Sequence, residues 1–443
     1  MVETVRIERM GHGVEAIGQM EDGKTAFVAG AVPGDVLEVE VTEDKPRFRR
    51  ARIARVAEPS AFRDDQAKPQ VGAPWAHIRY EAQLRFKREN VVGALVHTAQ
   101  FDPARAEGLV APCLACRREW GYRNKVELNA QADEAGRLQL GFEREGTHEL
   151  VSSKSYPIAH AQISKVCPAL QGALRYAQGS QDLKVHRVGV RHSLATNELE
   201  VALWTEPGPF PRAMVAKTVG SAVRATSIVR VLAEPGRARK VKGVEVLAGK
   251  GRWGEALCGF AYEVTAPSFF QVNTAQAEKL VAEVVRGAGG ELIEGEPTGL
   301  EGLVVADLYA GCGTFSIPLA WAGAEVVAVE SAGSSVRDLR RNAEVNDVDI
   351  EVVGGDAARE LPRIGEADVL VVDPPRAGLA PEVVESAAEL ACGRVVYVSC
   401  DPLTWARDVQ RLEERGYVLE SAQPVDLFPQ TYHVEVASVL RRA

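Results

Sequence analysis

The chain has 443 residues, of which 46% are hydrophobic and 26% are charged, a composition typical of a globular protein of two or three domains. No apolar stretch is long enough to cross a bilayer, and the first ten residues lack the apolar core of a signal peptide, so we expect a cytoplasmic protein with no membrane partner. Seven irregularly spaced cysteines argue against a disulfide framework and for reduced thiols.

Charge is distributed unevenly along the chain. The net charge is −9, yet residues 1–262 contain 38 of the 52 Lys and Arg residues and only 31 of the 61 Asp and Glu residues. The positive charge is therefore confined to the front of the chain, where a polyanion such as nucleic acid could be held.

The pattern of residues 1–58 predicts a small β-barrel. Three β-rich runs, Val2–Ile7, Thr25–Val28 and Val36–Val41, are separated by turns that contain glycine. A basic stretch without an intervening acid follows the third run and is interleaved with Phe48, so we expect an RNA-facing strip. Its candidate RNA contacts are Lys45, Arg47, Arg49 and Arg50. The alternative is a solvated edge strand, on which charge is also useful.

Residues 59–70 are predicted to be a linker, and residues 71–262 a central domain. Residues 80–97 have the apolar spacing of a helix. Strand-like runs then predict a mainly antiparallel α+β region; they are Lys125–Gln131, Leu138–Phe142, Arg187–Arg191, Leu199–Trp204 and Ser227–Leu232. Arg123 and Lys125, where this region opens, are candidates for contact with RNA phosphate, and a surface turn is the alternative.

Residues 263–443 alternate apolar runs with helical segments. The runs are Val304–Leu308, Glu325–Glu330, Ile350–Val353, Val369–Asp373 and Arg394–Val398. This alternation predicts an α/β fold with a doubly wound, Rossmann-like parallel sheet.

The first of these runs leads into a glycine loop. Gly311 and Gly313 let the backbone approach a ligand closely. Glu330 ends the next run, where a carboxylate can accept hydrogen bonds from both hydroxyls of a ribose. Because the third glycine of a pyrophosphate cradle is missing, a sulfonium nucleoside fits better than NAD. Asp356, after the third run, is a candidate for the adenine amino group or, alternatively, a helix N-cap.

Two further turns carry reactive groups. Tandem prolines after Asp373 leave two backbone positions without N–H donors, so this turn can present a carboxylate and bare carbonyls to a planar base or a methyl donor. Cys400 follows the fifth run, at the edge where open α/β sheets bind ligands. We interpret it as a nucleophile; the alternative is a small buried hydrophobe.

In these motifs and their order the chain resembles the RNA uracil-5 methyltransferases, which make 5-methyluridine with S-adenosylmethionine. The matching stretches are Tyr80–Asn90, Tyr122–Lys125, Phe269–Asn273, Tyr309–Thr314, Asp373–Arg376, Ser399–Pro402 and His433–Glu435. The resemblance implies that residues 1–58 are an RNA-binding TRAM domain and that residues 263–443 form the methyltransferase domain.

The resemblance also implies roles for individual residues. Cys400 would be the nucleophile, and Glu435 the general base. The cofactor contacts would be Gln271, Tyr309, Gly311, Gly313, Thr314, Glu330, Asp356 and Asp373. Thr314 stands where the family often has Asn.

The chemistry implied is a covalent one. The thiolate of Cys400 would add to uracil C6 so that C5 becomes reactive enough to accept the methyl group, and Glu435 would then remove the C5 proton. A helix expected to begin near Leu403 would favour the thiolate through its dipole, and Asp401 opposes this but is available to hydrogen-bond uracil. The target uridine must leave its stack to react.

The TRAM-like front end points to 23S ribosomal RNA, because family members that modify tRNA often lack it. The alternatives are tRNA, or cytosine at the same carbon, which the position of Cys400 after the fifth run disfavours. An alternative from another class is a non-catalytic RNA-binding factor, which would be expected to have lost Cys400, Glu435 or Gln271.

Many members also carry an iron–sulfur cluster, and two of its cysteine positions are occupied here by Gln70 and Ala73. Cys167 stands at what looks like the last ligand position, and one thiolate cannot hold the cluster. We expect no cluster and no metal; the alternative is that Cys113, Cys116 and Cys167 bind another metal.

Overall fold

The computed structural model describes residues 2–64, 66–143, 150–151, 156–179, 182–236, 240–390 and 392–443. The chain folds into two compact units. The first unit consists of Met1–Glu119, Pro374–Leu379 and Tyr397–Ala443, and the second consists of Trp120–Asp373 and Ala380–Val396. Because each unit is assembled from separate stretches of chain, the units do not test the continuous domain boundaries expected from the sequence. Those boundaries stay predictions.

The first unit begins with a closed five-stranded barrel, as predicted. Its strands are β1 (Val2–Met10), β2 (Glu15–Gln19), β3 (Thr25–Ala29), β4 (Val36–Asp44) and β5 (Phe48–Glu58), in the order β1-β2-β3-β5-β4. Alternate residues such as Val5, Ile7, Leu37 and Val39 point inward and are fully buried. This alternation is the period of two that a strand with one apolar face requires.

The rest of the first unit consists of two helices that follow the barrel and of the C-terminal part of the chain. Helix α1 (Tyr80–His97) has the bounds that the sequence predicted, and α2 (Pro103–Leu109) follows it. Strand β21 (Arg394–Ser399), helix α10 (Pro402–Glu413) and strands β22 (Tyr417–Val425) and β23 (Glu435–Arg442) complete the unit, with strand order β21-β23-β22.

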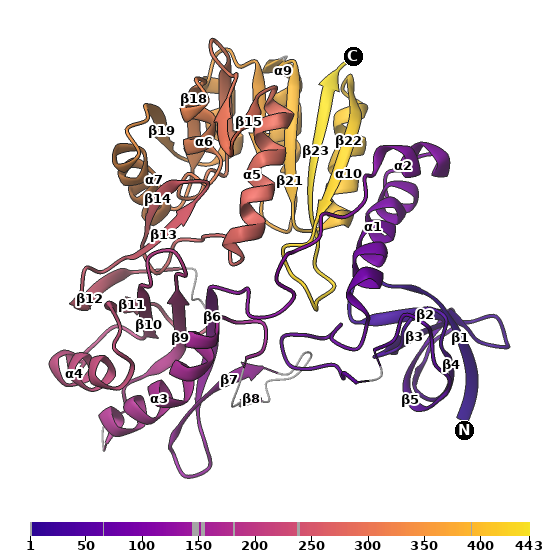
Figure 1. Cartoon of the computed structure of the whole chain (residues 1–443), viewed down its shortest axis with the longest axis horizontal. Helices are drawn as coiled ribbons and strands as arrows, with labels where there is room; N and C mark the ends of the chain where they lie inside the picture. Colours follow the sequence, from indigo (N-terminus) through magenta and orange to yellow (C-terminus); the bar gives the residue numbers. More distant parts are fainter. Residues whose placement is uncertain are drawn as a thin grey trace. The chain divides into compact units, whose positions relative to one another are not determined.

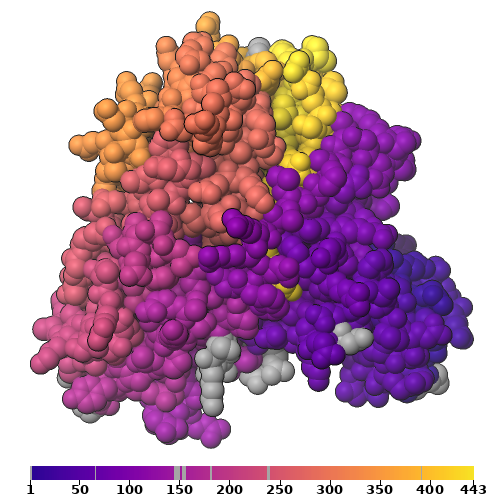
Figure 2. Space-filling view, in the orientation of Figure 1, coloured from indigo at the N-terminus to yellow at the C-terminus, as the bar shows by residue number. Residues whose placement is uncertain are grey.

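Helix α1 contacts β1 of the barrel as well as α10 and β22 (Figure 1). In the space-filling view the surface of α1 and α2 lies directly beside that of the C-terminal strands (Figure 2).

The polar face of α1 holds the segment between β22 and β23. Lys87 Nζ lies 2.5 Å from Asp426 Oδ1, and neither side chain is exposed to solvent. The same lysine donates to Phe428 O at 3.0 Å, while Tyr80 OH donates to Asp426 Oδ2 at 2.8 Å. Gln83 completes the row, because its Nε2 donates to Gln430 Oε1 and its Oε1 accepts from Gln430 N, both at 2.9 Å. These residues recur at helical spacing, so one helix face positions the whole segment.

The second unit contains the α+β sheet and part of the parallel sheet. The seven strands of the first are β6 (Lys125–Ala132), β7 (Leu138–Glu143), β8 (Leu150–Val151), β9 (Val185–His192), β10 (Leu199–Thr205), β11 (Ser227–Leu232) and β12 (Gly243–Gly249), in the order β12-β11-β10-β9-β6-β7-β8. All described pairs are antiparallel except β10 with β11. Helices α3 (Ala161–Gln178) and α4 (Arg212–Val223), which the strand-like runs did not reveal, pack together against it (Figure 1).

The parallel strands of this unit are ordered as a doubly wound fold requires. β17 (Val304–Leu308), β18 (Glu325–Glu330), β19 (Ile350–Gly354) and β20 (Val369–Val372) are arranged β19-β18-β17-β20, all parallel. The helices associated with them are α5 (Thr274–Ala288), α6 (Ser316–Trp321), α7 (Gly333–Val345), α8 (Ala357–Glu360) and α9 (Pro381–Leu390). The order reverses at β17, and ligands bind at such a switch point.

Shorter elements complete the second unit. They are the hairpin of β13 (Trp253–Leu257) with β14 (Phe260–Val264), the pair β15 (Glu291–Ile293) with β16 (Glu296–Thr298), and the 3₁₀ turn Leu361–Arg363. No helix in the described part of the chain is long and apolar enough to span a membrane.

Replacing Lys87 by Met should destabilise the first unit strongly, because the buried carboxylate of Asp426 would lose its cation. The expected loss is about 3–5 kcal/mol in the free energy of unfolding, measured by urea denaturation of the full chain. A Lys87→Met/Asp426→Asn double variant should recover part of this loss, since it leaves no buried charge.

The matched control is Arg85→Met, which removes an exposed cation two residues away that pairs with Glu89. It should have a far smaller effect. Equal stability of the Lys87→Met and Arg85→Met variants would contradict the role given to the ion pair.

Candidate active site

A cavity of about 120 Å³ in the first unit surrounds Cys400. Its lining residues are His12, Asn90, Arg376, Cys400, Asp401, Pro402, Leu403, Tyr432, His433 and Val434. They come from the barrel, from α1, from the turn at Pro374–Leu379 and from both ends of the C-terminal stretch. The thiol that the sequence singled out therefore lies in a hollow built from several distant segments.

The turn after Cys400 is a helix N-terminus. Asp401 caps α10, because its Oδ1 accepts from the N–H groups of Leu403 at 3.0 Å and Thr404 at 3.1 Å. The helix begins at Pro402, so the positive end of its dipole lies at the thiol and favours a thiolate. Through Oδ1 the carboxylate of Asp401 satisfies backbone donors that every helix leaves open, and its availability to uracil stays a prediction.

Arg376 reaches the same cavity because α10 holds its turn. Thr404 Oγ1 donates to Arg376 O at 3.1 Å, and Arg407 Nη2 donates to Ala377 O at 2.8 Å. Asp408 is fully buried and accepts from Leu379 N at 2.7 Å. The sequence motif contained Arg376 but assigned it no role; as a cation that lines the same cavity as the thiol, it also favours the thiolate.

Glu435 begins β23 and is 5% exposed. It is paired in register with Val425 and directly follows Val434, which lines the cavity. Aromatic contacts order the residues before it, since the ring of His433 lies 4.2 Å from that of Tyr432 and 5.7 Å from that of Phe428. Glu435 itself is not one of the lining residues, so the structure brings it next to the cavity rather than into it.

A second candidate cluster lies in the second unit, where β17 and β18 end. Tyr309 has a φ of 64°, a strained conformation for a residue with a side chain. Gly311 has a φ of 58° and open space where a Cβ would be, whereas a Cβ on Gly313 would lie 2.5 Å from Leu339. Glu330 accepts from Gly311 N at 2.9 Å through Oε2. Each carboxylate oxygen has two lone pairs, so Glu330 retains acceptor capacity for a ligand.

Two acids with raised pKa values lie at the same end of the sheet. Asp307 is fully buried; its Oδ2 accepts from Ser316 Oγ, and its Oδ1 has no hydrogen-bond partner in the described part of the chain. Desolvation raises the pKa of Asp307 to about 7, and the charge of Glu330 adds to the effect. Desolvation followed by repulsion from Asp307 likewise raises the pKa of Asp373 to about 7. Such a pair is suited to a cationic ligand.

Gln271 lies on a loop that the central sheet holds in place. Asn124 Nδ2 donates to Gln271 O at 3.0 Å, and Asn124 N donates to Val272 O at 2.8 Å. Arg191, which is 3% exposed, donates to Thr265 O and Ser268 O at the start of the loop. The Tyr122–Lys125 motif thus contains a positioning residue, Asn124, that sequence reasoning missed.

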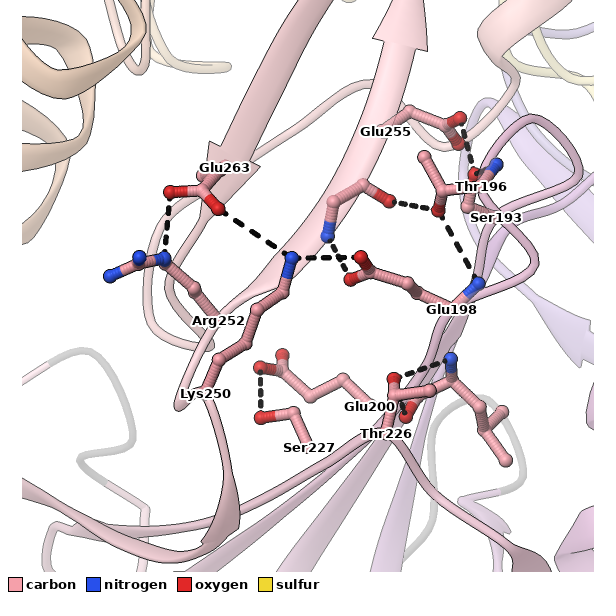
Figure 3. Close-up of polar contacts among 12 residues, drawn as sticks. Ser193, Thr196, Glu198, Glu200, Thr226, Ser227, Lys250, Arg252, Glu255 and Glu263 are labelled. Carbon is pink, nitrogen blue, oxygen red and sulfur yellow. Dashed lines mark hydrogen bonds and ion pairs between the residues drawn. The ribbon is translucent and has the colours of Figure 1, made fainter. Parts of the chain in front are cut away.

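The hairpin before this loop is tied to the turn between β9 and β10 (Figure 3). Glu198 Oε2 accepts from Gly254 N at 2.7 Å, and Ser193 Oγ donates to Glu255 Oε1, also at 2.7 Å. Glu255 Oε2 accepts from Thr274 Oγ1 at 3.1 Å, where α5 begins. Both ends of the Gln271 loop are therefore anchored to the central sheet.

Asp356 and Thr314 take local roles. The carboxylate of Asp356 caps the short helix α8 by accepting from Ala358 N at 3.1 Å. This is the alternative that the sequence left open for it. Thr314 is partly buried in the turn after Gly313. Contact of either residue with a cofactor stays a prediction.

The basic strip of the barrel faces a row of acids on β4. Register pairs Asp44 with Arg49 and Glu43 with Arg50, and two further Arg–Glu pairs continue the row. Arg50 Nη1 lies 3.1 Å from Glu43 Oε2, and Lys45 Nζ lies 3.2 Å from Glu43 Oε1. Arg49 also pairs with Glu3 and Asp22. The strip therefore carries much less net positive charge than its sequence suggests, although Arg47 is exposed at its end.

Arg123 and Lys125 are tied to the central sheet. Arg123 Nε donates to Lys125 O at 2.9 Å, and Lys125 Nζ lies 2.6 Å from Glu127 Oε1. Desolvation, with repulsion from Arg191, lowers the pKa of Lys125 to about 8 despite the opposing charge of Glu127. Their contact with RNA stays a prediction.

The cysteines considered as metal ligands are all free thiols. Cys116 and Cys167 are buried, and desolvation raises the pKa of Cys167 to about 12. Within the described residues, no group of three or more His, Cys, Asp or Glu side chains could hold a metal ion.

Comparison with known proteins matches both ends of the chain. The family described as tRNA (Uracil-5-)-methyltransferase matches residues 255–443, and the TRAM domain matches residues 2–54. Two proteins named as uncharacterized RNA methyltransferases are similar over nearly their whole length. That of Thermosynechococcus vestitus is 33% identical over 98% of this chain and 97% of its own, and that of Gloeobacter violaceus is 34% identical over 99% and 96%.

One solved structure is similar throughout. The Pyrococcus abyssi tRNA (uracil-54, C5)-methyltransferase, in complex with S-adenosyl-L-homocysteine, superposes with a TM-score of 0.76 and 26% identity. The superposition covers 98% of this chain and 99% of that one.

Replacing Asp307 by Asn should change how stability depends on pH. The folded chain keeps a proton at Asp307 that the unfolded chain releases between pH 3.8 and about 7. The free energy of unfolding of the wild type should therefore fall, relative to Asp307→Asn, as pH rises through this window, by no more than about 4 kcal/mol. Asn can still accept from Ser316, so the variant should fold.

The measurement is urea denaturation at several pH values. Glu351→Gln, which removes an exposed carboxylate on β19, is the matched control. A difference between wild type and Asp307→Asn that stays constant with pH would contradict the raised pKa.

Proposed function

Because this chain belongs to the tRNA (uracil-5-)-methyltransferase family, an RNA methyltransferase family that uses S-adenosylmethionine, we propose that Cys400 forms a covalent bond with C6 of a uridine in 23S ribosomal RNA. The observation that carries the covalent mechanism is the cavity around Cys400, in which the thiol lies at a helix N-terminus with Arg376 in the same wall. Both features favour the thiolate that the reaction needs.

The residues at the ends of β17 and β18 fit S-adenosylmethionine. Glu330 offers acceptors to ribose hydroxyls, and the open space at Gly311 lets the backbone approach the nucleoside. The carboxyl groups of Asp307 and Asp373, both with raised pKa values, would stabilise a cation. The residues we propose as cofactor contacts are Gln271, Tyr309, Gly311, Gly313, Thr314, Glu330, Asp356 and Asp373. S-adenosylmethionine supplies an electrophilic methyl group.

The reaction needs two groups from the first unit. The Cys400 thiolate adds to uracil C6, which places electron density on C5 so that C5 can be methylated. Glu435 then removes the C5 proton, and the C6–S bond breaks to release the product and the free thiol. The fixed segment between β22 and β23 supports this role for Glu435, since Lys87 and Gln83 hold the chain just before it.

Cys400→Ala should abolish the covalent adduct with RNA that contains 5-fluorouridine, because fluorine at C5 cannot be removed and the wild-type adduct is trapped. Glu435→Gln should lower turnover on ordinary RNA by about 10²–10⁴-fold and accumulate an adduct that has already been methylated. Adducts are measured by mass spectrometry of the intact protein.

Cys258→Ala removes another partly exposed thiol and should react like the wild type. An adduct with the Cys400→Ala variant would overturn the assignment of the nucleophile.

Ribosomal RNA is proposed on the presence of the TRAM barrel, and transfer RNA is the second candidate. The observation that favours transfer RNA is that the archaeal tRNA enzyme superposes on 98% of this chain, so the barrel does not separate the two substrates. Either substrate must deliver an unstacked uridine to the cavity.

Deleting the gene should remove 5-methyluridine from 23S ribosomal RNA while leaving transfer RNA unchanged. Nucleoside mass spectrometry of the separated RNA fractions measures this loss, and adding purified enzyme with S-adenosylmethionine to the undermodified RNA should restore it. Loss confined to transfer RNA would support the second candidate and refute the first.

A further inference from the structure

The barrel contributes directly to the cavity around Cys400. His12 lies between β1 and β2 and lines the cavity together with Asn90 of α1. Neither residue belongs to the motifs assigned to catalysis or cofactor binding. The barrel, for which the sequence predicted only a basic RNA-facing strip, therefore also places a side chain in the wall of this cavity.

The loop that carries His12 is held in a defined conformation. Asn90 Nδ2 donates to Gly11 O at 3.1 Å, and Gly11 N donates to Glu15 O at 2.9 Å. A Cβ on Gly11 would lie 2.7 Å from Glu15 O, so no larger residue fits there without a shift. Asn90 is 8% exposed, and its helix is itself fixed by the buried pair of Lys87 and Asp426. His12 is thus presented by a rigid support.

The electrostatic surroundings favour a neutral imidazole. Part of the His12 side chain is open to solvent, but the groups around its ring desolvate it; this desolvation and the charge of Arg9 lower the pKa of His12, with a smaller contribution from His97, while Asp401 opposes them. Arg376 and His433 also line the cavity. A neutral histidine has one donor and one acceptor, which matches a hydroxyl better than a phosphate.

The position of His12 suggests which part of the nucleotide it meets. Cys400 is partly buried, whereas the side chain of His12 is exposed. When a uracil base contacts the thiol, the ribose attached to that base lies nearer the solvent-exposed side of the cavity. The ribose 2′-hydroxyl is both donor and acceptor, and it is the group by which proteins distinguish RNA from DNA.

We propose that the β1–β2 loop of the barrel forms one wall of the uridine pocket and that His12 hydrogen-bonds a ribose hydroxyl of the nucleotide whose base reaches Cys400. This inference rests on the proposed role of the cavity as the uridine site. It makes the barrel part of the pocket and assigns it a share in the choice of RNA over DNA.

The test is protection of Cys400 from alkylation by iodoacetamide, followed by peptide mass spectrometry, with oligouridylate or oligodeoxyuridylate as the probe. For the wild type, the RNA oligomer should protect at a concentration about ten-fold lower than the DNA oligomer, the effect of about one hydrogen bond. In His12→Ala this ratio should approach one, and His12→Gln, which keeps a donor and an acceptor, should retain part of it.

Glu8→Gln is the matched control, since it alters an exposed side chain of β1 that does not line the cavity and does not shift the pKa of His12, and it should keep the wild-type ratio. A loop that was merely disturbed would weaken protection by both oligomers equally, so an unchanged ratio in His12→Ala overturns the proposal. Failure of the RNA oligomer to protect Cys400 of the wild type would also overturn the proposal. If the ratio depends on His12 but 5-fluorouridine RNA forms no adduct, the covalent mechanism fails while this inference stands.

Discussion

The interaction on which the first unit depends is the buried ion pair between Lys87 and Asp426. Two charges without solvent are stable only when both are fully paired, and here Tyr80 and the carbonyl of Phe428 satisfy the remaining positions. The partners are 339 residues apart in sequence, so the pair forces a helix near the barrel to hold the segment before Glu435. The order of the cavity around Cys400 follows from this constraint.

The second unit uses buried polar groups in a different way. Asn124 and Arg191 donate to backbone carbonyls of the loop that carries Gln271, which makes the central sheet a support for this proposed cofactor contact. The negative charges of Asp307 and Asp373 are instead not fully compensated by their surroundings. The raised pKa values of both carboxyl groups reflect the free-energy cost of desolvating them. A bound cation would reduce that cost, because it stabilises the carboxylate form.

The barrel surface is less basic than the sequence of β5 alone suggests. The arginines of β5 follow one another in the sequence without an intervening acid, but each of the four in register with β4 faces an acid. The barrel side chain that reaches the candidate active site is a histidine in a loop, which no charge pattern singles out. Binding of RNA by this barrel therefore depends on more than its basic strip.

The sequence by itself determined the local elements and singled out the thiol that we propose as the nucleophile. Apolar periodicity and glycine turns predicted α1, β11, β17 and β18 at their observed bounds, and Cys400 at a strand end, because these depend on near neighbours in the chain. Only the tertiary structure decided that His12, Asn90 and Arg376 surround that thiol, that Asp401 caps a helix, and that the basic run is paired. Each of these depends on which distant segments meet, and residue spacing along the chain does not encode that.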